Sequence, residues 1–172
     1  METQLPEIVA FTGHRDIRFG PGDDRRGLER RLERTLAKLY ELGYRRFMSG
    51  MARGFDMLAA NAVLDLRLTY PDTELIAALP FEGQAAGFPV GVRREYDAIL
   101  ASADRIEVVG SGYSPDVFLR RDDYMVERAG LFVAWYDGRR GGTSYTVSRA
   151  RARGLRVINL YRDGLPELFA DR

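Results

Sequence analysis

Residues 132–147 read FVAWYDGRRGGTSYTV, a stretch that joins an apolar strand pattern to a glycine-rich loop and then to a helix pattern. The apolar run ends at Asp137-Gly138, and residues 141–144, Gly-Gly-Thr-Ser, precede the helix. Two adjacent glycines at this place have two interpretations. They form a tight turn with Thr143 or Ser144 as the helix cap, or they let backbone N–H groups approach a phosphate closely.

The same alternation of strand and helix patterns continues along the whole chain. It predicts an α/β fold, a three-layer Rossmann-like domain whose mostly parallel sheet has helices on both faces. The length suits one such domain, residues 1–172, and no repeat or linker divides it. The predicted strands cover residues 8–11, 45–49, 74–79, 105–109, 131–135 and 155–160.

The helix predicted after the first strand begins with a dense group of charges. Asp23 or Asp24 is suited to cap it. Its arginine-rich beginning, residues 25–34, has Glu29 and Glu33 interleaved with the arginines. Acidic and basic residues three or four positions apart pair on a helix surface. The cluster is therefore interpreted as a solvated, salt-bridged face rather than as a basic patch.

Composition excludes several classes of function. Cysteine is absent and His14 is the one histidine, so disulfides and thiolate metal sites are excluded and no metal is expected. A net charge of +1 argues against nucleic acid as a partner. No apolar run is long enough to span a membrane, and the polar start, residues 1–7, has no signal core. These features predict a cytoplasmic protein.

Four segments that follow predicted strands carry the candidate site: residues 12–15, 49–56, 80–82 and 137–144. In a parallel sheet the carboxyl ends of the strands meet at one edge, and ligands bind there. Glycines let backbone amides contact an anion, and a following helix adds its dipole. None of these segments is a Gly-x-Gly-x-x-Gly fingerprint or a Walker loop, so no motif alone identifies the ligand.

The polar residues at these strand ends each keep two interpretations. Asp56 suits a ribose hydroxyl or a backbone amide, because its carboxylate would repel phosphate. His14 is either a hydrogen-bonded structural residue or a general base. Arg15 either binds phosphate or is solvated. If the protein is a hydrolase, the candidate acids are Asp56, Glu82, Asp122 and Asp137.

Four motifs occur in one order along the chain, and together they resemble the YpsA-like family of the SLOG superfamily from about residue 8 to residue 160. The motifs are Phe11-Thr12-Gly13-His14-Arg15, Ser49-Gly50-Met51-Ala52-x-Gly54-x-Asp56, Leu79-Pro80-Phe81-x-x-Gln84, and Arg121-x-x-Tyr124-Met125-Val126 leading to Trp135-Tyr136-Asp137-Gly138-x-x-Gly141-Gly142-Thr143.

The resemblance implies a Rossmann-like sheet that binds a nucleotide-derived ligand, such as NAD or a molecule like ADP-ribose. It also implies self-association as a homodimer. Together with the strand-end analysis it gives a set of expected ligand-binding residues and no assigned catalytic residue. That set is Gly13, His14, Arg15, Gly50, Gly54, Asp56, Pro80, Arg121, Asp137, Gly141, Gly142 and Thr143.

Relatives of the family that the chain resembles suggest the alternative functions. LOG-type phosphoribohydrolases, which cut cytokinin nucleotides, carry a Glu shortly after Gly-Gly-x-Gly-Thr. Here residues 144–148 contain no carboxylate. The prediction is therefore a nucleotide-ligand sensor or adaptor, which acts through a protein partner rather than by a reaction. The alternatives are a LOG-type nucleotide or N-glycoside hydrolase and, further, DprA-like handling of single-stranded DNA.

Overall fold

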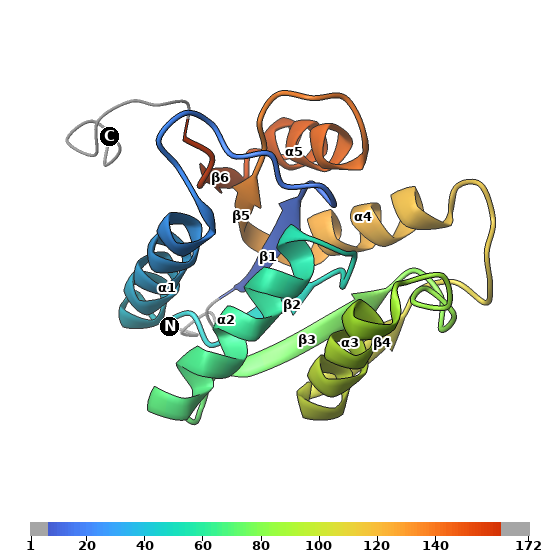
Figure 1. The fold of residues 1–172 in the computed structure, drawn as a ribbon, viewed down its shortest axis with the longest axis horizontal. Helices are drawn as coiled ribbons and strands as arrows, with labels where there is room; N and C mark the ends of the chain where they lie inside the picture. The colour runs from blue at the N-terminus through green and yellow to red at the C-terminus, as the bar shows by residue number, and fades with distance from the viewer. Residues whose placement is uncertain (1–6, 163–172) are drawn as a thin grey trace, which may run out of the picture.

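Six parallel strands form one sheet in the order β4-β3-β2-β1-β5-β6 (Figure 1). The structure, a computed structural model, describes residues 7–162. The predicted α/β arrangement is confirmed. The strands are β1 (Ile8–Gly13), β2 (Arg46–Ser49), β3 (Glu74–Leu79), β4 (Arg105–Val108), β5 (Ala129–Trp135) and β6 (Arg156–Asn159).

Five helices cover the two faces of this sheet, with α1, α2 and α3 on one face and α4 and α5 on the other (Figure 1). Strand residues alternate between the two layers: Val9 and Phe11 pack toward the first layer and Ala10 toward the second. The helices are α1 (Arg25–Glu41), α2 (Phe55–Thr69), α3 (Val90–Ser102), α4 (Val117–Arg128) and α5 (Gly142–Ala152).

The order in which strands are added to the sheet reverses between β1 and β5, which lie side by side. From β1 the chain adds β2, β3 and β4 on one side, then returns through α4 to β5 and adds β6 on the other. Consequently the connection after β1 leads to one face and the connection after β5 to the opposite face. This is the point at which open α/β sheets bind ligands, outside the carboxyl ends of the strands.

Arg31 of α1 corrects one prediction. It does not lie on a solvated face, because its side chain is only 8% exposed. Its guanidinium donates to both carboxylate oxygens of Asp23, at 2.8 and 2.7 Å, and to the carbonyl of Leu160 at 2.8 Å. The prediction was wrong because Leu160 is distant in sequence. Of the two cap candidates, Asp24 caps α1 by accepting from the backbone N–H of Gly27 at 2.7 Å.

The two ends of the predicted domain, residues 1–6 and 163–172, lie outside the described residues, as does most of the polar start. Within residues 7–162 no helix has the length and apolar character needed to cross a bilayer.

Candidate functional site

A cavity of about 470 Å³ opens where the loops after β1 and β5 diverge. Its walls come from these two loops, the segment before α2, and the facing ends of α4 and α5. Predicted residues that line it are Gly13, His14, Arg15, Asp56, Arg121, Gly142 and Thr143. The other predicted residues do not line it: Gly50, Gly54, Pro80, Asp137 and Gly141.

The N-terminus of α5 forms one wall of this cavity. The N-cap is Gly141, whose φ of 144° favours glycine, and no side chain among residues 7–162 caps the helix. The chain therefore does not adopt the tight turn in which Thr143 or Ser144 would cap the helix. Gly142 and Thr143 line the cavity. The first-turn N–H groups have no partner within a helix, and no acidic residue in that turn offsets the helix dipole.

Gly142 is not closely packed against other residues. A Cβ placed there would have one heavy atom within 4 Å among its surroundings in the described chain, Oδ2 of Asp122 at 3.8 Å. Packing in the protein interior therefore does not require a glycine at position 142. It leaves the N-terminus of α5 open toward the cavity.

Three other predicted glycines are explained by close packing instead. A Cβ on Gly13 would lie 2.4 Å from Phe55, and one on Gly50 would lie 2.7 Å from the guanidinium of Arg121. Gly54 has a φ of 82°, and its Cβ would lie 2.4 Å from a backbone oxygen of the loop after β1. These glycines let α2 and α4 approach the sheet closely.

The segment before α2 binds groups of the chain itself. At the start of α2, the backbone N–H of Phe55 donates to the carbonyl of His14 at 3.2 Å. The backbone N–H of Ala52 donates to Oδ2 of Asp56 at 3.3 Å. Directly before Ala52, buried Met51 has a φ of 58°, an uncommon conformation for a residue with a side chain. This segment is a scaffold for the cavity, and the backbone N–H groups of Ala52 and Phe55 are already engaged.

Arg121 joins three elements beneath the cavity. Its buried guanidinium donates through Nη1 to the carbonyl of Gly50, at the end of β2, and to that of Ala78 in β3 at 3.4 Å. Nε donates to Oδ1 of Asp122 at 2.8 Å. The positive charge also stabilises the ionised form of the nearby Asp56 carboxyl. Arg121 therefore serves both the packing of α4 on the sheet and the charge balance of the cavity.

Two carboxyl groups are buried beside Arg121. Burial raises the pKa of Asp122 and raises that of Asp56 to about 7, although the charge of Arg121 acts in the opposite direction on each. Within residues 7–162, Oδ1 of Asp56 has no hydrogen-bond partner. Asp56 lines the cavity, and its Oδ1 is a buried acceptor beside it that no group of the described chain satisfies.

His14 connects the loop after β1 to the loop after β5. Its Nε2 lies 2.9 Å from Oδ1 of Asp137, while Oδ2 of Asp137 accepts from Nε of Arg139 at 2.6 Å. Arg139 also donates through Nη2 to the carbonyl of Asp16 at 2.7 Å. Burial lowers the pKa of His14, against the raising effect of the Asp137 carboxylate. Asp137 is therefore a positioning residue behind the cavity, and Arg139 forms part of its wall.

The first turn of α4 contributes two wall residues that were not predicted from the sequence. Phe118 and Leu119 line the cavity, and the guanidinium carbon of Arg15 lies 5.0 Å from the centre of the Phe118 ring. These residues precede no glycine and follow no strand directly, so the strand-end rule does not select them. Arg139, which was not predicted as a site residue, is placed by its contact with Asp137. Pro80 lies outside the cavity, and its carbonyl accepts a hydrogen bond from the backbone N–H of Gly110 at 2.9 Å.

Replacing Asp56 with Asn should remove a pH dependence of stability. Because the pKa is raised from 3.8 to about 7, the folded state binds this proton more tightly than the unfolded state. The stabilisation is complete below about pH 4 and is lost as the pH rises through 7. Asn keeps an acceptor for Ala52 without the charge. The advantage of Asp56→Asn over the wild type should therefore be larger at pH 8.5 than at pH 5, by roughly 2–3 kcal/mol.

Thermal unfolding at the two pH values measures this difference, which corresponds to several degrees for a chain of this size. Asp65→Asn, an exposed position on the same helix, is the matched control and should give no such change. An equal effect of Asp56→Asn at both pH values would contradict the raised pKa.

Comparison with known proteins identifies the family. The model of the YpsA family, described as the YspA SLOG family, matches residues 9–157. The chain belongs to the YpsA family of SLOG proteins. UPF0398 proteins of Bacillus thuringiensis (strain Al Hakam) and Bacillus cereus (strain AH187) are each 27% identical over 155 residues, covering 86% of this chain and 84% of the relative. The resemblance drawn from the four motifs is confirmed.

Solved structures of DNA processing protein A share the fold. The Streptococcus pneumoniae protein superposes with a TM-score of 0.59 at 20% identity, over 88% of this chain and 49% of that one. The Helicobacter pylori protein, described as binding single-stranded DNA, gives 0.60 at 16% identity, over 89% and 64%. The YpsA-family chain thus spans about half to two thirds of these proteins, and at such identities the likeness concerns the fold.

Proposed function

We propose that the protein binds a nucleotide-derived ligand of the NAD or ADP-ribose class in the cavity between β1, α4 and α5. The observation that carries this proposal is the uncapped N-terminus of α5, which opens on the cavity through Gly142. Backbone N–H groups and the helix dipole at such a terminus favour phosphate. Arg15 and Arg139 add guanidinium groups to the same cavity.

Asp56 supports a ligand that carries hydroxyl groups as well as phosphate. Its Oδ1 is a buried acceptor without a partner among residues 7–162, and a ribose hydroxyl that reached it would be a suitable donor. The phosphate end of the ligand lies at α5 in this proposal, and the sugar lies toward α2. The ligand thereby spans the cavity from the N-terminus of α5 to the start of α2.

Binding without a reaction, as in a sensor or adaptor with a protein partner, remains our principal proposal for the biological role. One observation favours hydrolysis as a second candidate. A carboxyl with a pKa of about 7, such as Asp56, suits general acid–base catalysis near neutral pH. Of the other candidate groups, Asp122 and His14 also line the cavity, whereas Glu82 does not.

DprA-like binding of single-stranded DNA is the further candidate, favoured by the shared fold with the Helicobacter pylori protein. The net charge of +1 gives little long-range attraction to a polyanion. DNA binding that relies on phosphate contacts weakens steeply with salt. A salt series with a labelled oligonucleotide therefore separates this candidate from binding of a small nucleotide.

A thermal-shift titration with ADP-ribose, NAD, AMP, ATP and a short oligonucleotide tests the proposal. A ligand at a hundred times its dissociation constant stabilises the folded state by about 2.7 kcal/mol, which is a shift of several degrees for a chain of this length. We expect that shift with ADP-ribose and NAD. Chromatography of the ligand after incubation reports hydrolysis. A flat response to every nucleotide would contradict the proposed function.

A further inference from the structure

The outer edge of β4 is unpaired, because β4 ends the sheet and pairs only with β3 among residues 7–162. An edge strand presents backbone N–H and C=O groups to any further strand, and proteins block such edges with proline, a bulge or charged side chains, above all lysine. β4 contains neither proline nor lysine, and it follows β3 in one uninterrupted register. The edge is therefore open to another strand of suitable charge.

The two apolar side chains of β4 lie on the face of the sheet that carries α3. Ile106 is in register with Ala77 and Val108 with Leu79, and both of these β3 residues pack toward that face. Even so, Ile106 is 49% exposed and Val108 is 43% exposed. α3 therefore does not cover the edge, and two branched apolar side chains are left for a partner to bury.

The two charged side chains of β4 lie on the opposite face. Arg105 and Glu107 are in register with Ile76 and Ala78, which pack in the layer of α4 and α5. Nη2 of Arg105 lies 3.3 Å from Oε1 of Glu107, and both side chains are accessible to solvent. A surface that pairs with a copy of itself must carry both members of each complementary pair. This face of β4 carries one charge of each sign.

Two antiparallel β4 strands have one register that satisfies both the backbone and the charges. Outward backbone groups occur at alternate residues, so an odd-numbered residue must face an odd-numbered one. The registers that then pair three residues of β4 are centred on Ile106 or on Glu107. Centring on Glu107 sets this carboxylate against its own copy, which is destabilising. Centring on Ile106 sets Arg105 opposite Glu107 of the second copy, twice, and pairs the two Ile106 side chains on the other face.

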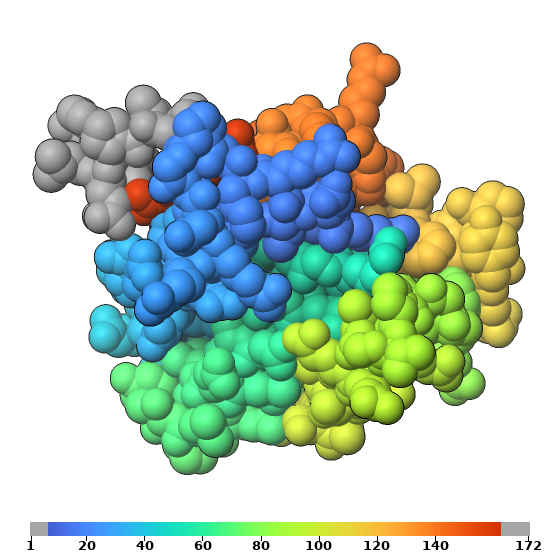
Figure 2. Space-filling view, in the orientation of Figure 1, coloured from blue at the N-terminus to red at the C-terminus, as the bar shows by residue number. Residues whose placement is uncertain are grey.

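The flank of α3 beside this edge also carries both signs of charge. Glu95 of α3 accepts from Asn61 of α2 at 2.6 Å, so the flank with Arg93 and Asp97, about half a turn round the helix, faces away from α2. Both residues are exposed, and neither has an ion-pair partner in the part of the chain that the structure describes. Figure 2 shows the yellow-green residues of α3 at the surface, on the side away from the orange residues of α5.

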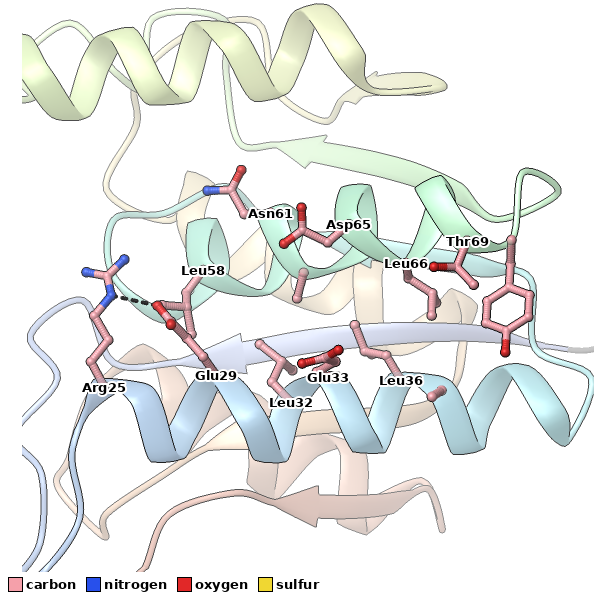
Figure 3. Close-up of a pocket in the computed structure, with 13 residues that line it drawn as sticks. Arg25, Glu29, Leu32, Glu33, Leu36, Leu58, Asn61, Asp65, Leu66 and Thr69 are labelled. Atoms are coloured by element: carbon pink, nitrogen blue, oxygen red, sulfur yellow. Dashed lines mark hydrogen bonds and ion pairs between the residues drawn. The ribbon is translucent and has the colours of Figure 1, made fainter.

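A groove of about 510 Å³ between α1 and α2 is the alternative surface for a second copy. Figure 3 shows the carboxylates of Glu33 and Asp65 on its two sides, and an ion pair between Arg25 and Glu29 at one end. Two copies that faced each other across this groove would bring carboxylates together, whereas β4 offers opposite charges. The charges therefore favour the edge of β4 over the groove.

The edge of β4 is separate from the proposed nucleotide site. A second cavity, of about 480 Å³, shares Arg15 and Asp16 with the cavity at α5 and lies on the α2 side of the loop after β1. No residue of β4 lines either cavity or the groove. Pairing through β4 therefore leaves the nucleotide site open, and it does not depend on the proposed function.

We propose that two copies of the chain pair through the outer edges of β4, antiparallel and centred on Ile106, so that one sheet continues through both copies. Self-association, which the family resemblance implies, specifies no surface, whereas the charge pattern of β4 specifies the edge, the direction and the register. The twofold axis closes this pairing, because each copy uses its one open β4 edge. Parallel pairing would lack this closure.

Analytical ultracentrifugation of the full chain without ligand tests the pairing. The wild type should sediment as a dimer, with twice the chain mass of 19.5 kDa. Arg105→Glu sets glutamate opposite Glu107 of the second copy, and Glu107→Arg sets arginine opposite Arg105. Each single variant should weaken dimerisation at least about tenfold, because like charges then face each other. Arg156→Glu, an exposed arginine on the opposite edge strand β6, is the matched control and should dimerise as the wild type does.

Mixing the two single variants separates lost pairing from lost folding. A copy with two acidic groups on β4 faces a copy with two basic groups, so an equimolar mixture of Arg105→Glu and Glu107→Arg should form a heterodimer. The double variant Arg105→Glu/Glu107→Arg restores opposite charges in the same register and should dimerise alone. Both results require folded protein, and neither follows if the charges only keep the edge soluble.

Several results would overturn the pairing. A wild type that stays monomeric up to about 100 µM has no such interface of useful affinity. A dimer that both single reversals leave unchanged, or that Arg156→Glu dissociates, is held by another surface. A mixture of the two single variants that stays monomeric would contradict the register centred on Ile106.

Discussion

Arg121→Ala should lower the free energy of unfolding by about 3–5 kcal/mol, the cost of removing one partner from a buried ionic group. The guanidinium holds the carbonyls of Gly50 and Ala78 and the carboxylate of Asp122. Its loss removes a donor from each of these acceptors, of which Gly50 keeps only the amide of Gln84 at 3.3 Å within residues 7–162, and removes the main positive charge beside Asp56 and Asp122. Chemical denaturation at pH 7.5 measures the effect, and the melting temperature should fall by roughly 10 °C.

Arg120→Ala is the matched control, because Arg120 is the adjacent arginine on α4 and is exposed. It lies 3.7 Å from Asp116 in an i,i+4 pair, and such surface pairs contribute about 0.5 kcal/mol or less. Arg121→Lys should fall between the two, since an ammonium supplies charge without the planar fork. Similar stabilities of Arg121→Ala and Arg120→Ala would contradict the structural role assigned to Arg121.

Gly142→Val should abolish binding of ADP-ribose, with a loss of affinity of at least about a hundredfold, while the melting temperature stays within a few degrees. The added side chain would stand at the open N-terminus of α5, where its Cβ would meet one heavy atom of the surrounding described chain within 4 Å, Oδ2 of Asp122. It would keep a phosphate from the backbone N–H groups of the first turn. Calorimetric titration of the folded variant measures the loss.

Gly91→Val provides the control for this substitution. Gly91 lies in the first turn of α3, and a Cβ there would have no neighbour within 4 Å in the described chain. Both substitutions place valine near a helix start with open space around it, but Gly91 lines neither cavity. Unfolding of Gly142→Val would show that the glycine serves the turn. Unchanged affinity in a folded Gly142→Val would show that the ligand does not bind at α5.

The fold could be predicted from the sequence because its signals are local and repeated. Apolar runs alternate with helix patterns, and the predicted strand 74–79 matches β3 in both bounds. The contact of Arg31 with Leu160 could not be predicted, since it joins residues 129 positions apart. Periodicity describes one helix at a time, and it carries no information about which distant carbonyl the helix meets.

The candidate site could be predicted in outline and not in the role of each residue. Gly13, Gly50 and Gly142 look equivalent in sequence, as glycines at strand ends. In three dimensions the first two make room for Phe55 and for Arg121, whereas Gly142 has open space beside it. Only the packing around each position separates a glycine that the fold requires from one that leaves a surface open to a ligand.

The most direct measurement of the central claim is an amide chemical-shift titration of the ¹⁵N-labelled protein with ADP-ribose. The amides of Gly142 and Thr143 should shift most strongly, because they would bind the phosphate, and the amide of Gly91 should not move. Saturable shifts at Gly142 and Thr143 would place the ligand at the N-terminus of α5. An unchanged spectrum, or shifts confined to the groove between α1 and α2, would contradict the account.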